Sequence, residues 1–136
     1  MKVGFACGVF DIFHAGHALM LKDCRAHCDF LIVAVNEANN FSETINPGKR
    51  KPVYTLEERK LILESSKYVD RVVTYSSEEE LLEIMKQEHI DVRFLGDDYV
   101  GKAITGAELG YEIVYINRDH GYSTTSVLKR IRESLG

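Results

Sequence analysis

The stretch GVFDIFHAGH, residues 8–17, joins an apolar run to two histidines, His14 and His17, that are three positions apart. The run from Lys2 to Cys7 predicts a short buried strand, and residues 17–28 have helical periodicity. At a strand-to-helix turn, free backbone N–H groups and the positive end of the helix dipole point outward. The stretch therefore predicts a βα unit whose turn binds an anion, with phosphate as the natural candidate.

The alternation of strand and helix patterns continues along the chain. Runs rich in β-branched and aromatic residues predict further strands at 30–35, 71–75, 91–95 and 112–116. Helical periodicity recurs at 55–66, 78–89, 101–109 and 124–134, and the helix starts at Thr55–Glu58 and Ser77–Glu80 match the capping box. This order predicts a doubly wound parallel sheet of about five strands, a Rossmann-like α/β fold with helices on both faces.

Length and composition limit the class of protein. A chain of 136 residues with 45% hydrophobic residues predicts one domain over 1–136. The formal net charge of −4 argues against nucleic acid as a partner. Apolar stretches too short to span a bilayer, with no cleavable signal, predict a cytoplasmic protein without a membrane partner. Cys7, Cys24 and Cys28 have no disulfide-framework spacing, which favours free thiols in a reducing compartment.

A second phosphate site is predicted after the last strand, where NRDHGYSTT, residues 117–125, leads into the last helix. Ser123 or Thr124 can cap that helix, which would by itself account for the hydroxyls. Arg118 adds a guanidinium suited to a phosphate chain. Loops at the carboxyl ends of parallel strands open at one edge of the sheet, so the histidine loop, the Gly96–Asp98 loop and this loop should converge around a triphosphate.

The histidines could also have roles other than phosphate binding. Either histidine can be a helix cap or a packing residue. His14 and His17 could also ligate zinc together with Cys24 or Cys28, although Cys24 falls on the helix face that must pack on the sheet. Neither a Gly-x-Gly-x-x-Gly fingerprint nor a Gly-Lys-Ser/Thr loop is present, which disfavours NAD enzymes and P-loop kinases.

The motifs together resemble the nucleotidyltransferase superfamily with a His-x-Gly-His box, most closely its small cytidylyltransferases of the glycerol-3-phosphate type. The resemblance is carried by Gly8–Asp11 through His17, Arg59–Glu64, Tyr68–Asp70, Gly96–Asp98, and Arg118 with Gly121–Thr125. It implies transfer of CMP from CTP to a phosphorylated small alcohol such as glycerol 3-phosphate. The products would be pyrophosphate and CDP-glycerol or a related CDP-polyol, a precursor for cell-surface polymers such as teichoic acid. A homodimer is also implied.

The resemblance also implies roles for individual residues. The catalytic residues would be His14, His17, Lys51 and Arg118. The nucleotide would be bound by Gly8, Val9, Phe10, His14, Ala15, Gly16, His17, Asp97, Arg118, Gly121, Tyr122, Ser123, Thr124 and Thr125. The acceptor would be bound by Lys49, Lys51 and Asp11, although Asp11 could instead support the histidine loop. Mg²⁺ would be carried by the triphosphate, without a protein metal site.

Two departures from the family pattern affect these expectations. The loop through Asn46–Gly48 is about one residue longer, which leaves open which of Lys49 and Lys51 contacts which phosphate. Lys67 replaces the arginine that glycerol-3-phosphate enzymes usually place at a dimer contact, and lysine lacks the bidentate fork of arginine.

Two alternative functions remain. One is an adenylyltransferase of the same superfamily that acts on a sugar phosphate such as heptose 1-phosphate, which FDIFHAGH and GYSTT would suit. Gly96–Asp98 and Arg59–Glu64 lean instead toward cytidylyl transfer. The other is a non-catalytic nucleotide-binding module. A class I aminoacyl-tRNA synthetase carries a related histidine box, but this chain has no room for its other domains.

Overall fold

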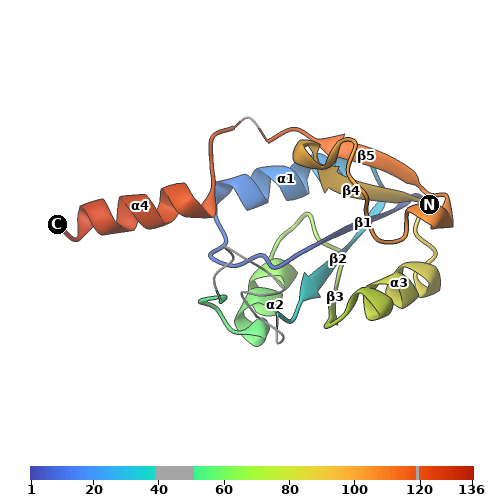
Figure 1. The fold of residues 1–136 in the computed structure, drawn as a ribbon, viewed down its shortest axis with the longest axis horizontal. Helices are drawn as coiled ribbons and strands as arrows, with labels where there is room; N and C mark the ends of the chain where they lie inside the picture. The colour runs from blue at the N-terminus through green and yellow to red at the C-terminus, as the bar shows by residue number, and fades with distance from the viewer. Residues whose placement is uncertain (39–50, 119) are drawn as a thin grey trace.

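A computed structural model describes residues 1–38, 51–118 and 120–136, and its centre is a sheet of five parallel strands in the order β3-β2-β1-β4-β5 (Figure 1). The strands are β1 (Val3–Gly8), β2 (Phe30–Asn36), β3 (Arg71–Tyr75), β4 (Val92–Gly96) and β5 (Glu112–Ile116). This arrangement confirms the predicted doubly wound, Rossmann-like fold. The strand order reverses beside β1, which is where such folds bind ligands.

Helices cover both faces of the sheet. The covering helices are α1 (Ala15–Ala26), α2 (Leu56–Glu64) and α3 (Glu78–Gln87), and a fourth helix, α4 (Thr124–Ser134), ends the chain's secondary structure. Leu21 and Cys24 of α1 and Leu63 of α2 pack in the core on one face, whereas Leu81 and Met85 of α3 pack on the other. Figure 1 shows α4 extending away from the sheet, and none of its residues is buried.

The central strands are apolar on both sides because both sides are covered. In β2, Leu31, Val33 and Val35 belong to the core beneath α1 and α2, and Ile32 and Ala34 belong to the core beneath α3. All five are at most 1% exposed. Burying a branched aliphatic side chain contributes about 1.5 to 3 kcal/mol, so this alternation fixes the strand in register between the two layers.

The predicted helix starts are confirmed in part. At Thr55 the capping box is complete, because the Thr55 hydroxyl accepts from the N–H of Glu58 and the Glu58 carboxylate accepts from the N–H of Thr55. At Ser77 only one half forms: its hydroxyl accepts from the N–H of Glu80, while the Glu80 carboxylate accepts from the Ser76 hydroxyl. The serine upstream of the cap competes for that carboxylate.

The predicted helix at 101–109 is wrong. Between β4 and β5 the chain instead forms two short 3₁₀ turns, η1 (Asp97–Tyr99), which precedes the predicted segment, and η2 (Ala107–Leu109), which lies at its end. Gly101, Gly106 and Gly110 have φ angles of 79°, 85° and 77°, which an α-helix does not allow. The apolar spacing imitated a helix, and the glycines interrupt it. The first helix also differs from the predicted 17–28, because it begins at Ala15 and ends at Ala26.

Within the ranges that the structure describes, no helix combines the length and the apolar character needed to cross a membrane.

Candidate active site

The two histidines of the turn between β1 and α1 form a capping box with each other. His14 is the N-cap of α1, and its Nδ1 accepts from the N–H of Gly16 at 3.0 Å. Nδ1 of His17 accepts in return from the N–H of His14 at 3.1 Å. The ring centroids are 3.9 Å apart. The histidines therefore do cap the helix, which is one of the roles that the sequence allows.

This capping also fixes the tautomer of both rings. Each Nδ1 accepts a hydrogen bond, so it carries no proton, and in a neutral imidazole the proton then resides on Nε2. Each ring thus keeps one N–H donor that the helix does not use. Two such donors beside the free N–H groups of the helix end suit an anion with several oxygens.

Burial and neighbouring positive charge keep both rings neutral. Desolvation, then the charges of His14 and Arg118, lower the pKa of His17 to about 4. Desolvation, then the charges of His120 and Arg118, lower the pKa of His14 from its usual value. The His17 ring also lies between aromatic neighbours, stacked on Phe13 with centroids 5.3 Å apart and tilted against Phe10 at 5.8 Å.

The loop that carries the histidines is held from beneath by two buried charged residues. Phe10 and Ile12 have positive φ angles, 54° and 46°, which side chains rarely adopt. The Asp11 carboxylate accepts from the N–H groups of Val53 and Tyr54, at 2.8 and 2.9 Å. This contact places Asp11, 7% exposed, in a supporting position, although the sequence also allowed it to bind the acceptor.

Arg59 ties the same loop to the ends of two other elements. Its side chain is 2% exposed and donates to the backbone carbonyls of Val9, Asn36, Glu37 and Tyr54. The sequence marks this residue only as part of the Arg59–Glu64 run, not as a site residue. One feature of the sequence could have indicated its role. A positive charge near the start of a helix is unfavourable for the helix dipole, so an arginine at that position suggests that its side chain makes contacts elsewhere.

Arg118 follows β5 and lies against the loop that follows β4. Its N–H donates to the Asp97 carboxylate at 3.4 Å, and its Nη1 lies 3.3 Å from the Asp98 carboxylate. A β-carbon added to Gly96 would lie 2.8 Å from Cδ of Arg118, so the glycine leaves room for the guanidinium stem. The ion pair is more than half exposed, and such a pair is weak enough for a phosphate to replace the carboxylate.

The loop before α4 brings a third histidine, His120, to the same place. A β-carbon added to Gly16 would lie 2.8 Å from Cε1 of His14 and 2.9 Å from Cε1 of His120. The loop turns at Gly121, where φ is 81°, and Ser123 caps α4 by accepting from the N–H of Ser126. The histidine loop, the Asp97–Asp98 turn, Arg118 and residues 120–125 therefore meet at one edge of the sheet.

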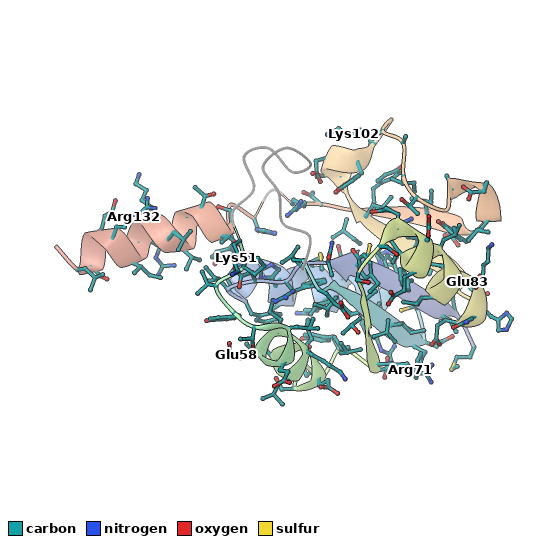
Figure 2. The ribbon with its side chains drawn as sticks, turned by 60° about the horizontal axis from the view of Figure 1, so that its bottom comes forward. Lys51, Glu58, Arg71, Glu83, Lys102 and Arg132 are labelled. Atoms are coloured by element: carbon teal, nitrogen blue, oxygen red, sulfur yellow. The ribbon has the colours of Figure 1, made fainter. Side chains whose placement is uncertain are left out.

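The remaining residues proposed from the sequence differ in how they can reach a ligand. Gly8 is the last residue of β1, and the half-buried Val9 follows it. The Phe10 side chain packs in the core, so only the backbone of Phe10 can face a ligand. Ala15 is exposed at the first position of α1, Tyr122 is exposed, and Thr124 and Thr125 open α4. Lys51 is exposed and lies on the side from which α4 extends (Figure 2), and Lys49 falls outside the described residues.

The zinc alternative receives no support from the cysteines. Cys24 is fully buried in the core beside Leu21, and burial raises the pKa of its thiol. The Cys28 thiol donates to the carbonyl of Cys24. In residues 1–38, 51–118 and 120–136, no three His, Cys, Asp or Glu side chains are arranged to hold a metal ion.

Replacing Gly16 with alanine is expected to reduce activity much more than stability. The new methyl would lie under 3.0 Å from two imidazoles and displace them, which weakens the His14 cap by about 0.5 to 2 kcal/mol, whereas alanine within a helix is favoured over glycine by about 0.5 to 1 kcal/mol. We expect kcat to fall about tenfold or more with a small change in melting temperature, because the two effects on stability oppose each other. Ala26→Gly, at the far end of α1, is the matched control, and activity of Gly16→Ala equal to the parent would contradict the placement of the rings.

The low pKa of His17 predicts acid-sensitive stability. The unfolded imidazole has a pKa near 6.5 and the folded one about 4, so below pH 6.5 the unfolded state binds more protons and the free energy of unfolding falls. Between pH 7.5 and 4.5 this contribution loses about 2 to 3 kcal/mol, since each pH unit is worth about 1.4 kcal/mol. Urea unfolding at both pH values should show a smaller loss for His17→Asn than for the parent; equal losses would contradict the assignment.

Known proteins with similar sequences and structures show the family to which the chain belongs. A family model described as cytidylyltransferase-like matches residues 5–131. The bifunctional protein HldE of Helicobacter pylori strain J99 is 32% identical over 133 residues, which cover 98% of this chain and 28% of that protein. HldE of Wolinella succinogenes is 37% identical over 133 residues, which cover 98% of this chain and 27% of the relative. The chain thus spans little more than a quarter of these relatives.

A solved structure extends the likeness to three dimensions. The crystal structure of the lipopolysaccharide core biosynthesis protein from Thermoplasma volcanium superimposes with a TM-score of 0.66 at 26% identity, covering 88% of this chain and 97% of that one. The fold, the histidine turn and the family match over nearly the whole length agree. The chain belongs to the cytidylyltransferase-like family of nucleotidyltransferases.

Proposed function

We propose that the chain transfers AMP from ATP to the phosphate of a sugar phosphate such as heptose 1-phosphate and releases pyrophosphate. The observation that carries the reaction type is the pair of neutral imidazoles, each with a free Nε2–H, held at a helix end within the field of Arg118. The similarity to HldE proteins supports the sugar phosphate and ATP over glycerol 3-phosphate and CTP. The similarity to a lipopolysaccharide core biosynthesis protein also favours a sugar substrate.

The proposed chemistry is an in-line displacement at the α-phosphorus. An oxygen of the acceptor phosphate forms the new P–O bond, while the bond from the α-phosphorus to the bridging oxygen of pyrophosphate breaks and pyrophosphate leaves with that electron pair. No side chain needs to act as a nucleophile. Charge builds on the phosphoryl oxygens and on the leaving group, and preorganised donors aimed at such oxygens stabilise the transition state.

His14 and His17 are assigned as those donors. Neutral rings keep Nδ1 engaged with the backbone, so their Nε2–H groups are oriented before the substrate arrives. Arg118, Ser123 and the first N–H groups of α4 would bind the phosphates on the opposite side, and Lys51 would approach the acceptor. Asp97 and Asp98 hold Arg118 in the structure, so their proposed role near the nucleotide is to position that guanidinium.

Mg²⁺ would arrive on the triphosphate. Mg²⁺ prefers oxygen ligands, which the phosphates themselves supply. The ion would neutralise charge on the phosphate chain. Assembly as a homodimer stays a prediction, and Lys67, whose ammonium lies over the Tyr68 ring at 5.2 Å, is the residue to examine there.

Cytidylyl transfer to glycerol 3-phosphate is the second candidate. The Gly96–Asp98 motif favours it, and the matching family model is described as cytidylyltransferase-like. Pyrophosphate release should therefore be measured with Mg²⁺, each of ATP, CTP, GTP and UTP, and an acceptor panel that includes heptose 1-phosphate and glycerol 3-phosphate. The His17→Asn variant, expressed and purified like the parent, is the control that measures pyrophosphate release by contaminating enzymes.

The panel separates the candidates. Turnover with ATP and a sugar phosphate supports the proposal, and turnover confined to CTP and glycerol 3-phosphate overturns it in favour of the second candidate. Nucleotide binding without release for any acceptor would support the non-catalytic module.

A further inference from the structure

We propose that His120 is a third imidazole of the phosphate site and donates a hydrogen bond from Nε2 to the polyphosphate chain of the nucleotide. The proposal deepens the proposed function and rests on it. It adds a binding residue that the sequence pattern does not mark, because the residue precedes the Gly121–Thr125 motif and belongs to no recognisable spacing with His14 or His17.

The position of His120 places it at the phosphate site. His14 and His120 come from loops more than 100 residues apart, yet Cε1 of both rings lies within 3.0 Å of the position that a β-carbon on Gly16 would take. Cε1 lies between Nδ1 and Nε2 in the imidazole ring, so in both rings Nε2 is one bond away from the atom nearest to Gly16. His120 is also close enough to His14 for an electrostatic interaction between the two rings to lower the pKa of His14.

The hydrogen bonding of the His120 ring matches that of His14. Nδ1 of His120 accepts from the N–H of Tyr122 at 3.0 Å, as Nδ1 of His14 accepts from the N–H of Gly16 at 3.0 Å. In both cases the acceptor bonds to the backbone two residues further along the chain. The same device therefore fixes the same tautomer, which leaves Nε2 of neutral His120 protonated and available as a donor.

A merely structural role would not require histidine at position 120. A turn that needs only an acceptor for the N–H of Tyr122 is satisfied by asparagine or aspartate, whose side-chain oxygen occupies the position of Nδ1. Histidine adds a second nitrogen beyond the turn, and His120 is only half-buried. The ring contacts Tyr122, with centroids 5.5 Å apart, so packing against the tyrosine is the competing role.

The variant that separates the two roles is His120→Asn. It keeps an acceptor for the N–H of Tyr122 and removes the Nε2 donor. His89→Asn is the matched control, because His89 is exposed, lies between α3 and β4, and has a φ of 50° that asparagine tolerates. Unchanged melting temperatures of both variants would show that the turn is kept. His120→Gln, which places an amide N–H near the position of Nε2, should restore part of the binding.

Two measurements test the proposal without relying on turnover. By calorimetry, His120→Asn should weaken binding of inorganic tripolyphosphate about tenfold or more, the effect expected for one hydrogen bond to a charged group, and His89→Asn should not. By NMR of the imidazole nitrogens, tripolyphosphate should shift Nε2 of His14, His17 and His120, with His27 and His89 unchanged.

The outcomes distinguish this proposal from the proposed function. If His14 and His17 respond and His120 does not, or if His120→Asn binds tripolyphosphate within threefold of the parent, the third imidazole is a packing residue and this proposal is overturned. If no histidine responds to tripolyphosphate or to any nucleotide, the phosphate site itself is absent, and the proposed function and this inference both fail.

Discussion

His17→Ala should lower kcat by about 10²- to 10³-fold, which corresponds to about 3 to 4 kcal/mol of lost transition-state stabilisation. The variant loses the Nε2–H that we assign to the phosphoryl oxygens. It also loses the acceptor for the N–H of His14. His14→Ala should lower kcat by a similar factor, since its ring is the partner donor.

The effect on catalysis must be separated from the loss of the cap. His17→Asn serves this purpose, because its side-chain oxygen can still accept from the N–H of His14 while the outer donor is gone. We expect His17→Asn to lose nearly as much activity as His17→Ala and to retain more stability. His27→Ala, at the exposed C-terminal end of α1, is the control. Single-turnover rates within threefold of the parent would remove His17 from the mechanism.

The sequence predicts the sheet well because each strand is a short run rich in β-branched and aromatic residues. Arg71–Tyr75 and Glu112–Ile116 are predicted with the bounds that the structure has. Periodicity alone does not tell a short apolar run from a buried helix, but a length of about four to eight residues with many β-branched side chains favours a strand. The prediction of a helix at 101–109 fails because apolar spacing alone cannot tell a helix from an irregular segment that glycines with positive φ interrupt.

The candidate site is predictable where residues lie on one motif and unpredictable where contacts join distant loops. His14, His17 and Arg118 stand out because their residue types and the adjoining helix starts indicate phosphate binding. The packing of His120 against Gly16 depends on how two loops pass each other, which no local pattern encodes. Arg59 is similar, because its four carbonyl partners come from three separate segments.

Arg59 should matter most for stability. Arg59→Met keeps much of the volume of the side chain but removes donors from four backbone carbonyls and leaves buried Asp11 without the guanidinium charge that faces it. Breaking a buried, hydrogen-bonded charge network costs about 3 to 5 kcal/mol. We therefore expect the free energy of unfolding in urea to fall by about that amount.

The loss should also reach the catalytic histidines. Arg59 holds the carbonyl of Val9, and the adjoining loop contains two residues in the disfavoured positive-φ region, Phe10 and Ile12. A strained loop persists only when its surroundings hold it, so without the guanidinium the histidine turn should relax and kcat should fall even where the variant is still folded. Lys60→Met is the matched control, because Lys60 is the next residue of α2 and is exposed. It should change neither the free energy of unfolding nor kcat appreciably. An Arg59→Met variant within about 1 kcal/mol of the parent, with normal turnover, would show that Asp11 alone suffices to hold the turn.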